Sequence, residues 1–262
     1  MNYLSVCAIL KDENIYLPEW IAYHRAVGVE HFYLYDNESG VPVATTLGAE
    51  VGSGLVSVIR QSGRAQQGPA YEDCLARRRH DSVWIAFVDI DEFIVPKAEV
   101  DLRLVVKKYE QFGGVGFNWQ VFGSSGLARR PEGLQIEGFT RRSVRRYSMN
   151  NHIKSIVRPT RALKYRDPHS FSYSESFCVN ERFARLENAF NEPPLHEVAQ
   201  INHYMLRSRQ EYEQKVRRGA ADGSKKTVPL LESWDREMNV EEDRDILRFA
   251  DATKRILGGV NP

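Results

Sequence analysis

Residues 84–93 read Trp84-Ile85-Ala86-Phe87-Val88-Asp89-Ile90-Asp91-Glu92-Phe93, an uncharged run that ends in a group of carboxylates. A strand without charge is typical of a parallel sheet that is buried on both faces. Open α/β sheets bind their ligands at the carboxyl ends of such strands. Because side chains at i and i+2 of an extended chain point the same way, we expect Asp89 and Asp91 to converge on one ligand.

The chain on both sides of this stretch alternates strands and helices. Apolar runs predict strands over residues 4–10, 31–35, 54–59, 83–88, 113–121 and 200–206. Helical spacing predicts helices over residues 16–27, 69–80, 102–112 and 210–218, and an acid-rich helical tail over 232–251. This order favours an α/β fold with a mostly parallel central sheet flanked by helices.

Composition narrows the class of protein. With 36 basic and 35 acidic residues among 262, the formal charge is +1, which argues against a nucleic-acid coat, so no nucleic-acid partner is expected. The three cysteines, Cys7, Cys74 and Cys178, are far apart and indicate reduced thiols of a cytosolic protein. No apolar run approaches the roughly 18 residues of a membrane span, so we expect no transmembrane segment, and any membrane contact must be peripheral.

The paired aspartates point to a metal. Carboxylate oxygens suit Mg²⁺ or Mn²⁺, the cations that usually bind a diphosphate in proteins. Acids after a strand also cap helices or face water, but the Asp-x-Asp spacing at this place favours the ligand interpretation.

A second group of polar residues follows the first two predicted strands. Lys11 and Glu13 come after one strand, and Asp36 and Asn37 come after the other. Their side chains could hydrogen-bond a base and a ribose. For Asn37 a turn is the better interpretation, whereas Asp36 is the better candidate for a ligand contact.

Short motifs extend along most of the chain, to about residue 219, in a fixed order. They are Lys11-Asp12-Glu13, Glu19-Trp20, Tyr23-His24, Gly28, Phe32, Tyr35-Asp36-Asn37-x-Ser39, Tyr71-x-Asp73-Cys74, Trp84 to Phe93, Asn118-Trp119, Phe122-Gly123-Ser124-Ser125-Gly126, Lys154-Ser155-Ile156-Val157-Arg158-Pro159 and Ile201-Asn202-His203-Tyr204. In this order and spacing they resemble glycosyltransferase family 92 and the related family 2-like group, as a bacterial-type member.

The resemblance implies a GT-A fold in one domain over residues 1–262. Residues 1–96 would form the nucleotide-binding half, 97–220 the acceptor-side half, and 221–262 a C-terminal loop and helix. The Asp-x-Asp would hold the metal on the donor's diphosphate, and His203 matches the place of a further ligand. Without the resemblance, a lone histidine in an apolar strand is more often a satisfied core residue.

The resemblance also places other residues around a nucleotide-sugar donor, with a UDP-sugar expected. Asp36 would read the base, and Arg64 and Gln67 would lie near the nucleotide. The remaining members of the predicted set are Lys11, Glu13, Asp89, Lys154 and Arg218. Lys215 and Arg218 flank the loop 219–227, which we expect to close over the diphosphate, although each single cation could instead be a solvated surface charge.

The implied reaction is metal-dependent, inverting transfer of a hexosyl group to a glycan or lipid-linked acceptor, as in polysaccharide biosynthesis. A carboxylate or imidazole must deprotonate the acceptor, and the candidates are Asp167, His169 and Glu175. We favour Glu175 because residues 171–177 are rich in aromatic and serine residues, although it could be an ordinary exposed carboxylate. Trp119 is a candidate platform for the acceptor sugar or a buried core residue.

Two other functions remain open from the residues alone. A phosphotransferase of the haloacid dehalogenase type also has Asp-x-Asp after an apolar strand, but by resemblance it needs Thr or Val where this chain has Phe93. A non-catalytic nucleotide-sugar-binding module would keep the pocket and lack the base. We expect a cytoplasmic location, at most peripheral to the inner membrane. The basic stretch 141–166 is the part that would approach anionic headgroups.

Overall fold

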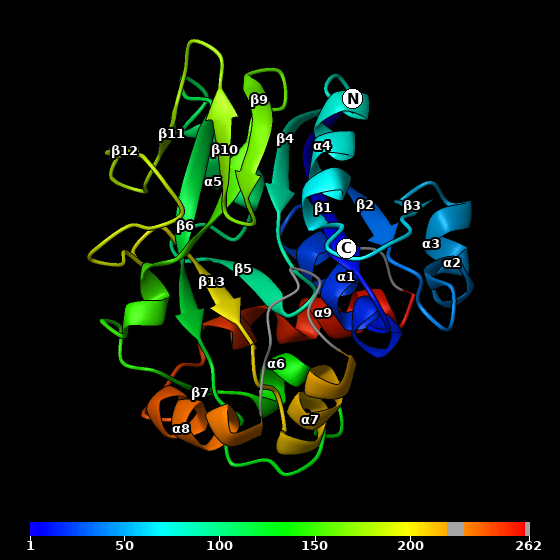
Figure 1. The fold of residues 1–262 in the computed structure, drawn as a ribbon, viewed down its shortest axis with the longest axis vertical. Coiled ribbons are helices and arrows are strands. Elements are labelled where there is room, and N and C mark those ends of the chain that lie inside the picture. The colour runs from blue at the N-terminus through cyan, green and yellow to red at the C-terminus, as the bar shows by residue number, and fades with distance from the viewer. Residues whose placement is uncertain (219–227, 260–262) are drawn as a thin grey trace.

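The computed structural model describes residues 1–218 and 228–259, with the backbone alone at residues 218 and 228–230. Its centre is a ten-stranded sheet with the strand order β12-β11-β6-β8-β4-β1-β2-β3, to which β13 and β5 are attached beside β6 (Figure 1). The strands are β1 (Asn2–Leu10), β2 (His31–Asp36), β3 (Val56–Arg60), β4 (Ser82–Phe87), β5 (Glu92–Pro96), β6 (Gly114–Val121), β8 (Ile153–Val157), β11 (Cys178–Val179), β12 (Arg185–Leu186) and β13 (Ala199–His203).

The first half of the sheet is parallel, as predicted. Strand β1 lies between β2 and β4 and is parallel to both, and β3 continues beyond β2. Antiparallel pairs follow in the rest of the sheet, where β8 runs antiparallel between β4 and β6, β5 is antiparallel to β13, and β12 is antiparallel to β11. The predicted fold class, α/β with a mostly parallel central sheet flanked by helices, is therefore confirmed.

Helices cover both faces of the sheet (Figure 1). They are α1 (Leu17–Ala26), α2 (Val43–Thr46), α3 (Gly48–Gly52), α4 (Gln67–Arg77), α5 (Leu102–Lys107), α6 (Gln135–Gly138), α7 (Arg209–Arg218), α8 (Val228–Met238) and α9 (Ala250–Leu257). Three 3₁₀ turns, Asn14–Tyr16, Ser148–Asn151 and Asp245–Phe249, and two small sheets, β9 (Ala162–Asp167) with β10 (Ser170–Tyr173) and β7 (Arg141–Arg142) with β14 (Glu241–Glu242), complete the described elements.

Strand β1 shows why the apolar runs are buried on both faces. Its alternate residues Val6 and Ala8 belong to the larger hydrophobic core, which also holds α1, whereas Cys7 and Ile9 belong to a second core beneath α4. Successive side chains of a strand point to opposite faces, so both sets must be apolar.

Four predictions about the later chain need correction. The helix expected over 102–112 ends at Lys107, and β5 was not foreseen because it directly follows the acidic turn. The strand expected over 200–206 ends at His203. The helical tail expected over 232–251 is divided into α8, a short strand, a 3₁₀ turn and α9.

The basic stretch 141–166 does not form one patch. Arg142 is buried and pairs with Glu241 at 2.7 Å and with Asp243 at 3.2 Å, so the acidic tail neutralises part of the stretch. Lys154 points into the interior and is 1% exposed. Among the residues with described structure, no helix is both long and apolar enough to cross a membrane.

Helix α1 carries a fully buried imidazole. His24 donates from Nδ1 to the carbonyl of Trp20 at 2.8 Å and stacks on Phe93 with ring centroids 5.7 Å apart. Burial lowers the pKa of His24 from 6.5 to about 4, because the charged form would lose its hydration.

We therefore expect His24 to contribute to acid sensitivity. The unfolded chain binds a proton at this side chain as the pH falls from 6.5 towards about 4, and the native state does not, so the free energy of unfolding decreases over that range. The loss from this group is on the order of 3 kcal/mol. Urea unfolding across this range should show a shallower pH dependence for His24→Gln, by up to about one proton.

The exposed His80 supplies the matched control, because His80→Gln makes the same change of an imidazole to an amide outside the core. A His24→Gln slope equal to that of the wild type would contradict the assignment.

Candidate functional site

The acidic stretch after β4 forms a turn rather than an extended strand. The amide of Glu92 donates to the carbonyl of Asp89 at 3.0 Å, and the amide of Asp89 donates to the Glu92 carboxylate at 2.9 Å. The premise that Asp89 and Asp91 point the same way along an extended chain was therefore wrong. The two carboxylates have different partners.

Asp89 is held by residues from two neighbouring elements. Lys154 on β8 donates to Asp89 at 2.8 Å, and Gln67 at the start of α4 donates to the other carboxylate oxygen at 3.1 Å. The structure thus brings together Asp89, Lys154 and Gln67, three residues of the predicted nucleotide-sugar set.

Lys154 also contacts Glu92 at 3.3 Å and donates to the carbonyl of Pro168 at 3.4 Å. Burial alone would lower the pKa of this ammonium, but Asp89 and Glu92 outweigh it and raise the pKa above its usual value. Glu92 is fully buried, and its burial raises the pKa of the carboxyl to about 8. Its Oε1 has no hydrogen-bond partner among the residues that the structure describes.

Asp91 has a second set of partners, which come from late in the chain. Strand β13 pairs with β5 so that His203 lies opposite Glu92, and this register places His203 Nε2 3.6 Å from Asp91 Oδ2. Lys215 on α7 donates to the same oxygen. Burial would raise the pKa of Asp91, but the charge of Lys215 and the contact with His203 hold it well below its usual range.

These residues supply a partial metal site. Asp91 and His203 offer one oxygen and one nitrogen donor side by side, a combination that suits Mn²⁺. Over residues 1–218 and 228–259 there is no group of three or more His, Cys, Asp or Glu residues placed to hold a metal ion. The pair fits an ion that takes its other ligands from phosphate oxygens and water, as Mg²⁺ commonly does.

Arg207 is a site residue that the sequence did not indicate. It donates to the carbonyl of Ile90 at 3.1 Å, lies 3.4 Å from Glu13, and places its guanidinium carbon 3.4 Å from the centroid of the Tyr16 ring. It is 6% exposed, and its charge helps to lower the pKa of Asp91. No motif surrounds Arg207, and only the return of the chain after β13 brings it to the turn.

At the end of β2, the side chains of Asp36 and Asn37 bond to loops of the protein itself. Both oxygens of Asp36 accept hydrogen bonds from backbone amides, those of Ser39 and Val43, each at 3.0 Å. The Asp36 carboxylate therefore holds its own loop. Asn37 does more than build a turn, because it donates to the carbonyls of Gln61 and Gly63 and ties this loop to the one after β3.

Three predicted cations of the donor site remain to be placed, namely Lys11, Arg64 and Arg218. Lys11 and Arg64 are exposed in the loops after β1 and β3, at the same edge of the sheet as Asp89. The side chain of Arg218 and the loop 219–227 lie outside the described residues.

Trp119 on β6 is buried rather than open. It is 9% exposed, stacks on His152 at 4.7 Å with an interplanar angle of 24°, and contacts His169 at 5.0 Å and His203 at 4.3 Å. Imidazoles cover the ring that the sequence offered as a sugar platform, so the core alternative describes Trp119 better.

The three candidate bases lie in different places. Asp167 accepts hydrogen bonds from the amides of His169 and Ser170 in the β9–β10 turn. His169 donates from Nδ1 to the carbonyl of Ile153 at 2.7 Å, which leaves Nε2 as the acceptor nitrogen, and burial together with Lys154 lowers its pKa to about 3. Both residues lie beside Lys154.

Glu175 lies elsewhere. It is exposed and follows β10, where Tyr173 and Ser176 pack against Gly113 just before β6 begins. Gly114 at the start of β6 and Ile85 of β4 both pair with Val157 of β8, so Gly113 lies level with β4 rather than with the acidic turn. The role of Glu175 as the base stays a prediction.

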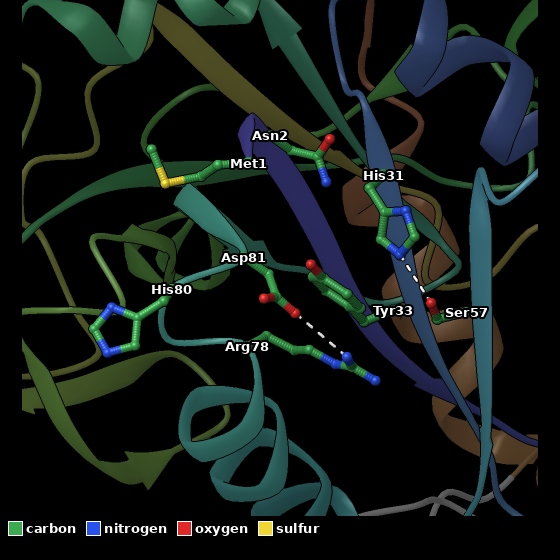
Figure 2. Close-up of a pocket in the computed structure, with 8 residues that line it drawn as sticks. All are labelled: Met1, Asn2, His31, Tyr33, Ser57, Arg78, His80 and Asp81. Carbon is green, nitrogen blue, oxygen red and sulfur yellow. Dashed lines mark hydrogen bonds and ion pairs between the residues drawn. The ribbon is translucent and has the colours of Figure 1, made fainter.

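A pocket of about 330 Å³ opens at the edge opposite Asp89, around the starts of β1 and β2 (Figure 2). His31 contacts Ser57 at 3.0 Å, and Arg78 pairs with Asp81 at 3.3 Å and lies over the ring of Tyr33 (Figure 2). None of the predicted site residues lines this pocket. Open α/β sheets bind at the other edge, so we place the site at Asp89 and Asp91.

Two plant proteins illustrate the sequence relatives of this chain. A glycosyltransferase family 92 protein of Oryza sativa subsp. japonica is 30% identical over 161 residues, which are 60% of this chain and 27% of that protein. Another of Ricinus communis is 24% identical over 245 residues, 90% of this chain and 40% of that protein. The chain thus spans less than half the length of these relatives, and membership of a bacterial type stays a prediction.

Solved structures match more distantly. TarS 1–349 of S. aureus in complex with UDP has 12% sequence identity and a TM-score of 0.40, over 60% of this chain and 47% of that chain. A UDP-glucose pyrophosphorylase complexed with UDP-glucose has 9% identity and a TM-score of 0.33, over 99% of this chain and 100% of that chain.

The family assignment rests on a match to a family model. The model of glycosyltransferase family 92 matches residues 2–172, which contain β1 to β4, the acidic turn and Lys154. This is more than half of the chain, and it agrees with the names of the plant relatives. The chain belongs to glycosyltransferase family 92.

Proposed function

We propose that this chain is a GT-A glycosyltransferase domain that transfers a hexosyl group from a UDP-sugar to a glycan or lipid-linked acceptor, in the presence of Mn²⁺ or Mg²⁺. The observation that carries the proposal is the Asp91–His203 pair, 3.6 Å apart at the carboxyl edge of the sheet. Lys215 pairs with Asp91, Arg207 binds the carbonyl of Ile90 in the same turn, and Lys154 pairs with Asp89. Family membership supports the reaction class, and because the chain matches only part of its relatives, the activity itself is part of the proposal.

The residues divide into those that would hold the ion and those that would hold the donor. Asp91 and His203 would bind the metal, whose chemistry is to neutralise negative charge on the departing diphosphate. Lys215, which pairs with Asp91, would also pair with a phosphate of the donor. Arg207 fixes the turn through the carbonyl of Ile90 and holds Glu13 beside it.

Transfer with inversion needs a base at the acceptor. Asp167 and His169 are the two predicted candidates at this edge, beside Lys154. With a pKa of about 3, His169 is neutral at ordinary pH and offers Nε2 as a proton acceptor of low basicity. Asp167 would have to release the hydrogen bonds of its turn to reach an acceptor.

A cytoplasmic location and peripheral membrane contact also belong to the proposal. The buried free thiols of Cys7, Cys74 and Cys178 support a reducing compartment. Exposed Arg145 and Arg146 are the residues of the basic stretch that would approach headgroups.

Turnover should be measurable directly. Incubation with UDP-glucose, UDP-galactose or UDP-N-acetylglucosamine and Mn²⁺ should release UDP from at least one donor, and faster when a glycan acceptor is added. Removal of the metal with EDTA should lower the rate about tenfold or more, because the leaving diphosphate loses charge stabilisation.

Calorimetric binding of a donor without any release of UDP would instead identify a non-catalytic module. If no nucleotide sugar bound at all, both functions would be excluded.

The Asp91→Asn variant tests the ion site. An amide is a weaker ligand than a carboxylate, so UDP should bind this variant about 10- to 100-fold more weakly in the presence of Mn²⁺. In EDTA the variant and the wild type should bind UDP within about twofold of each other. Isothermal titration calorimetry measures both, and circular dichroism checks the fold.

Asp81→Asn is a matched control, because Asp81 pairs with Arg78 at the opposite edge of the sheet. It should bind UDP like the wild type under both conditions. Equal Mn²⁺-dependent affinities for Asp91→Asn and the wild type would contradict a metal-binding role of Asp91.

A further inference from the structure

A row of ring side chains leads from the surface to Asp91. Phe190 is 49% exposed, and its ring lies 4.6 Å from that of His152. His152 stacks on Trp119 at 4.7 Å, and Trp119 lies 4.3 Å from His203, which contacts Asp91. We call Phe190, His152, Trp119 and His203 the aromatic row.

The segment that presents Phe190 is firmly attached. Asn191 donates to Asn118 Oδ1 at 2.7 Å, and Asn118 donates back to the carbonyl of Asn191 at 3.1 Å. Further along, His196 bonds the carbonyl of Trp119 at 2.8 Å. Because these contacts tie the segment to β6 itself, the position of Phe190 relative to Trp119 is fixed before any ligand binds, which lowers the entropic cost of binding.

Exposure alone does not identify Phe190 as a binding residue, since single exposed apolar side chains are common. Phe183 is equally exposed, at 49%, but it packs on Tyr109 and Phe112, away from the acidic turn. What distinguishes Phe190 is the continuous contact through His152 and Trp119 to the residues beside Asp91.

We propose that Phe190 and His152 form an acceptor subsite, where a sugar unit beyond the reacting one stacks on the Phe190 ring. The inference rests on the proposed function, because it assumes that transfer occurs at Asp91. The apolar C–H face of a pyranose packs well on an aromatic ring, and its hydroxyl groups stay in water. Since Trp119 is covered by imidazoles, Phe190 is the ring of the row that a sugar can reach.

This placement defines the class of acceptor. Three ring-to-ring steps, each 4.3 to 4.7 Å, separate Phe190 from His203, so a single sugar at Asp91 does not reach Phe190. The subsite therefore favours a neutral oligosaccharide over a monosaccharide.

An array of immobilised neutral oligosaccharides, from one to six units long, tests the subsite. The wild type should bind at least one series with a signal that rises with length. Phe190→Ala should weaken binding of the longer members about fivefold to tenfold and leave that of the monosaccharide unchanged. Phe190→Trp should retain the preference for length.

The equally exposed Phe183→Ala is the control and should bind like the wild type. Calorimetry of UDP binding in the presence of Mn²⁺ tests the donor site separately. The affinity for UDP should be the same in Phe190→Ala and in the wild type. A wild type without preference for length, or a Phe190→Ala variant that keeps it, would overturn the subsite. Failure of the wild type to bind UDP would overturn the proposed function instead, whatever the array shows.

Discussion

The ammonium of Lys154, buried between the carboxylates of Asp89 and Glu92, is the interaction on which the site depends. A buried charge costs several kcal/mol unless it is paired and hydrogen-bonded. Lys154 meets this condition only because β8 runs antiparallel beside β4 and begins against the acidic turn. Its further bond to Pro168 attaches the β9–β10 turn, with Asp167 and His169, to the same place. One cation thus joins the donor side of the site to the acceptor side.

The second carboxylate is balanced independently. Asp91 is paired by Lys215 and influenced by Arg207, both from the chain after β13. The acids of the turn are therefore matched by cations from two separate segments, β8 and the chain after β13. Such a site can accept a metal ion together with a diphosphate, because each brings charge that the other offsets.

The sequence predicted those parts of the fold that depend on local pattern. The strands β1 to β4 and the helices α1 and α4 follow from apolar runs and helical spacing. Gln67 and Lys154, which were assigned with Asp89 to the nucleotide-sugar set, both contact Asp89, and their role in binding a donor stays a prediction. The errors arose where tertiary contacts decide. Asp89 to Glu92 form a turn because Glu92 bonds back to Asp89, and no propensity reveals that bond. Arg207 was missed because no motif surrounds it in the sequence.

The two sides of Asp91 differ in charge, and this difference indicates which substrate each side binds. On one side stand Arg207 and Lys215, cations from the chain after β13, which suit phosphate. On the other side, burial lowers the pKa of both His152 and His169, so these imidazoles are neutral and pack as rings around Trp119. A neutral, ring-lined surface offers no attraction to a second anion but packs well against the apolar faces of sugars. The protonation of these histidines thus has a consequence for selectivity, since charging them would place positive charge on the acceptor side as well and reduce the difference between the two sides.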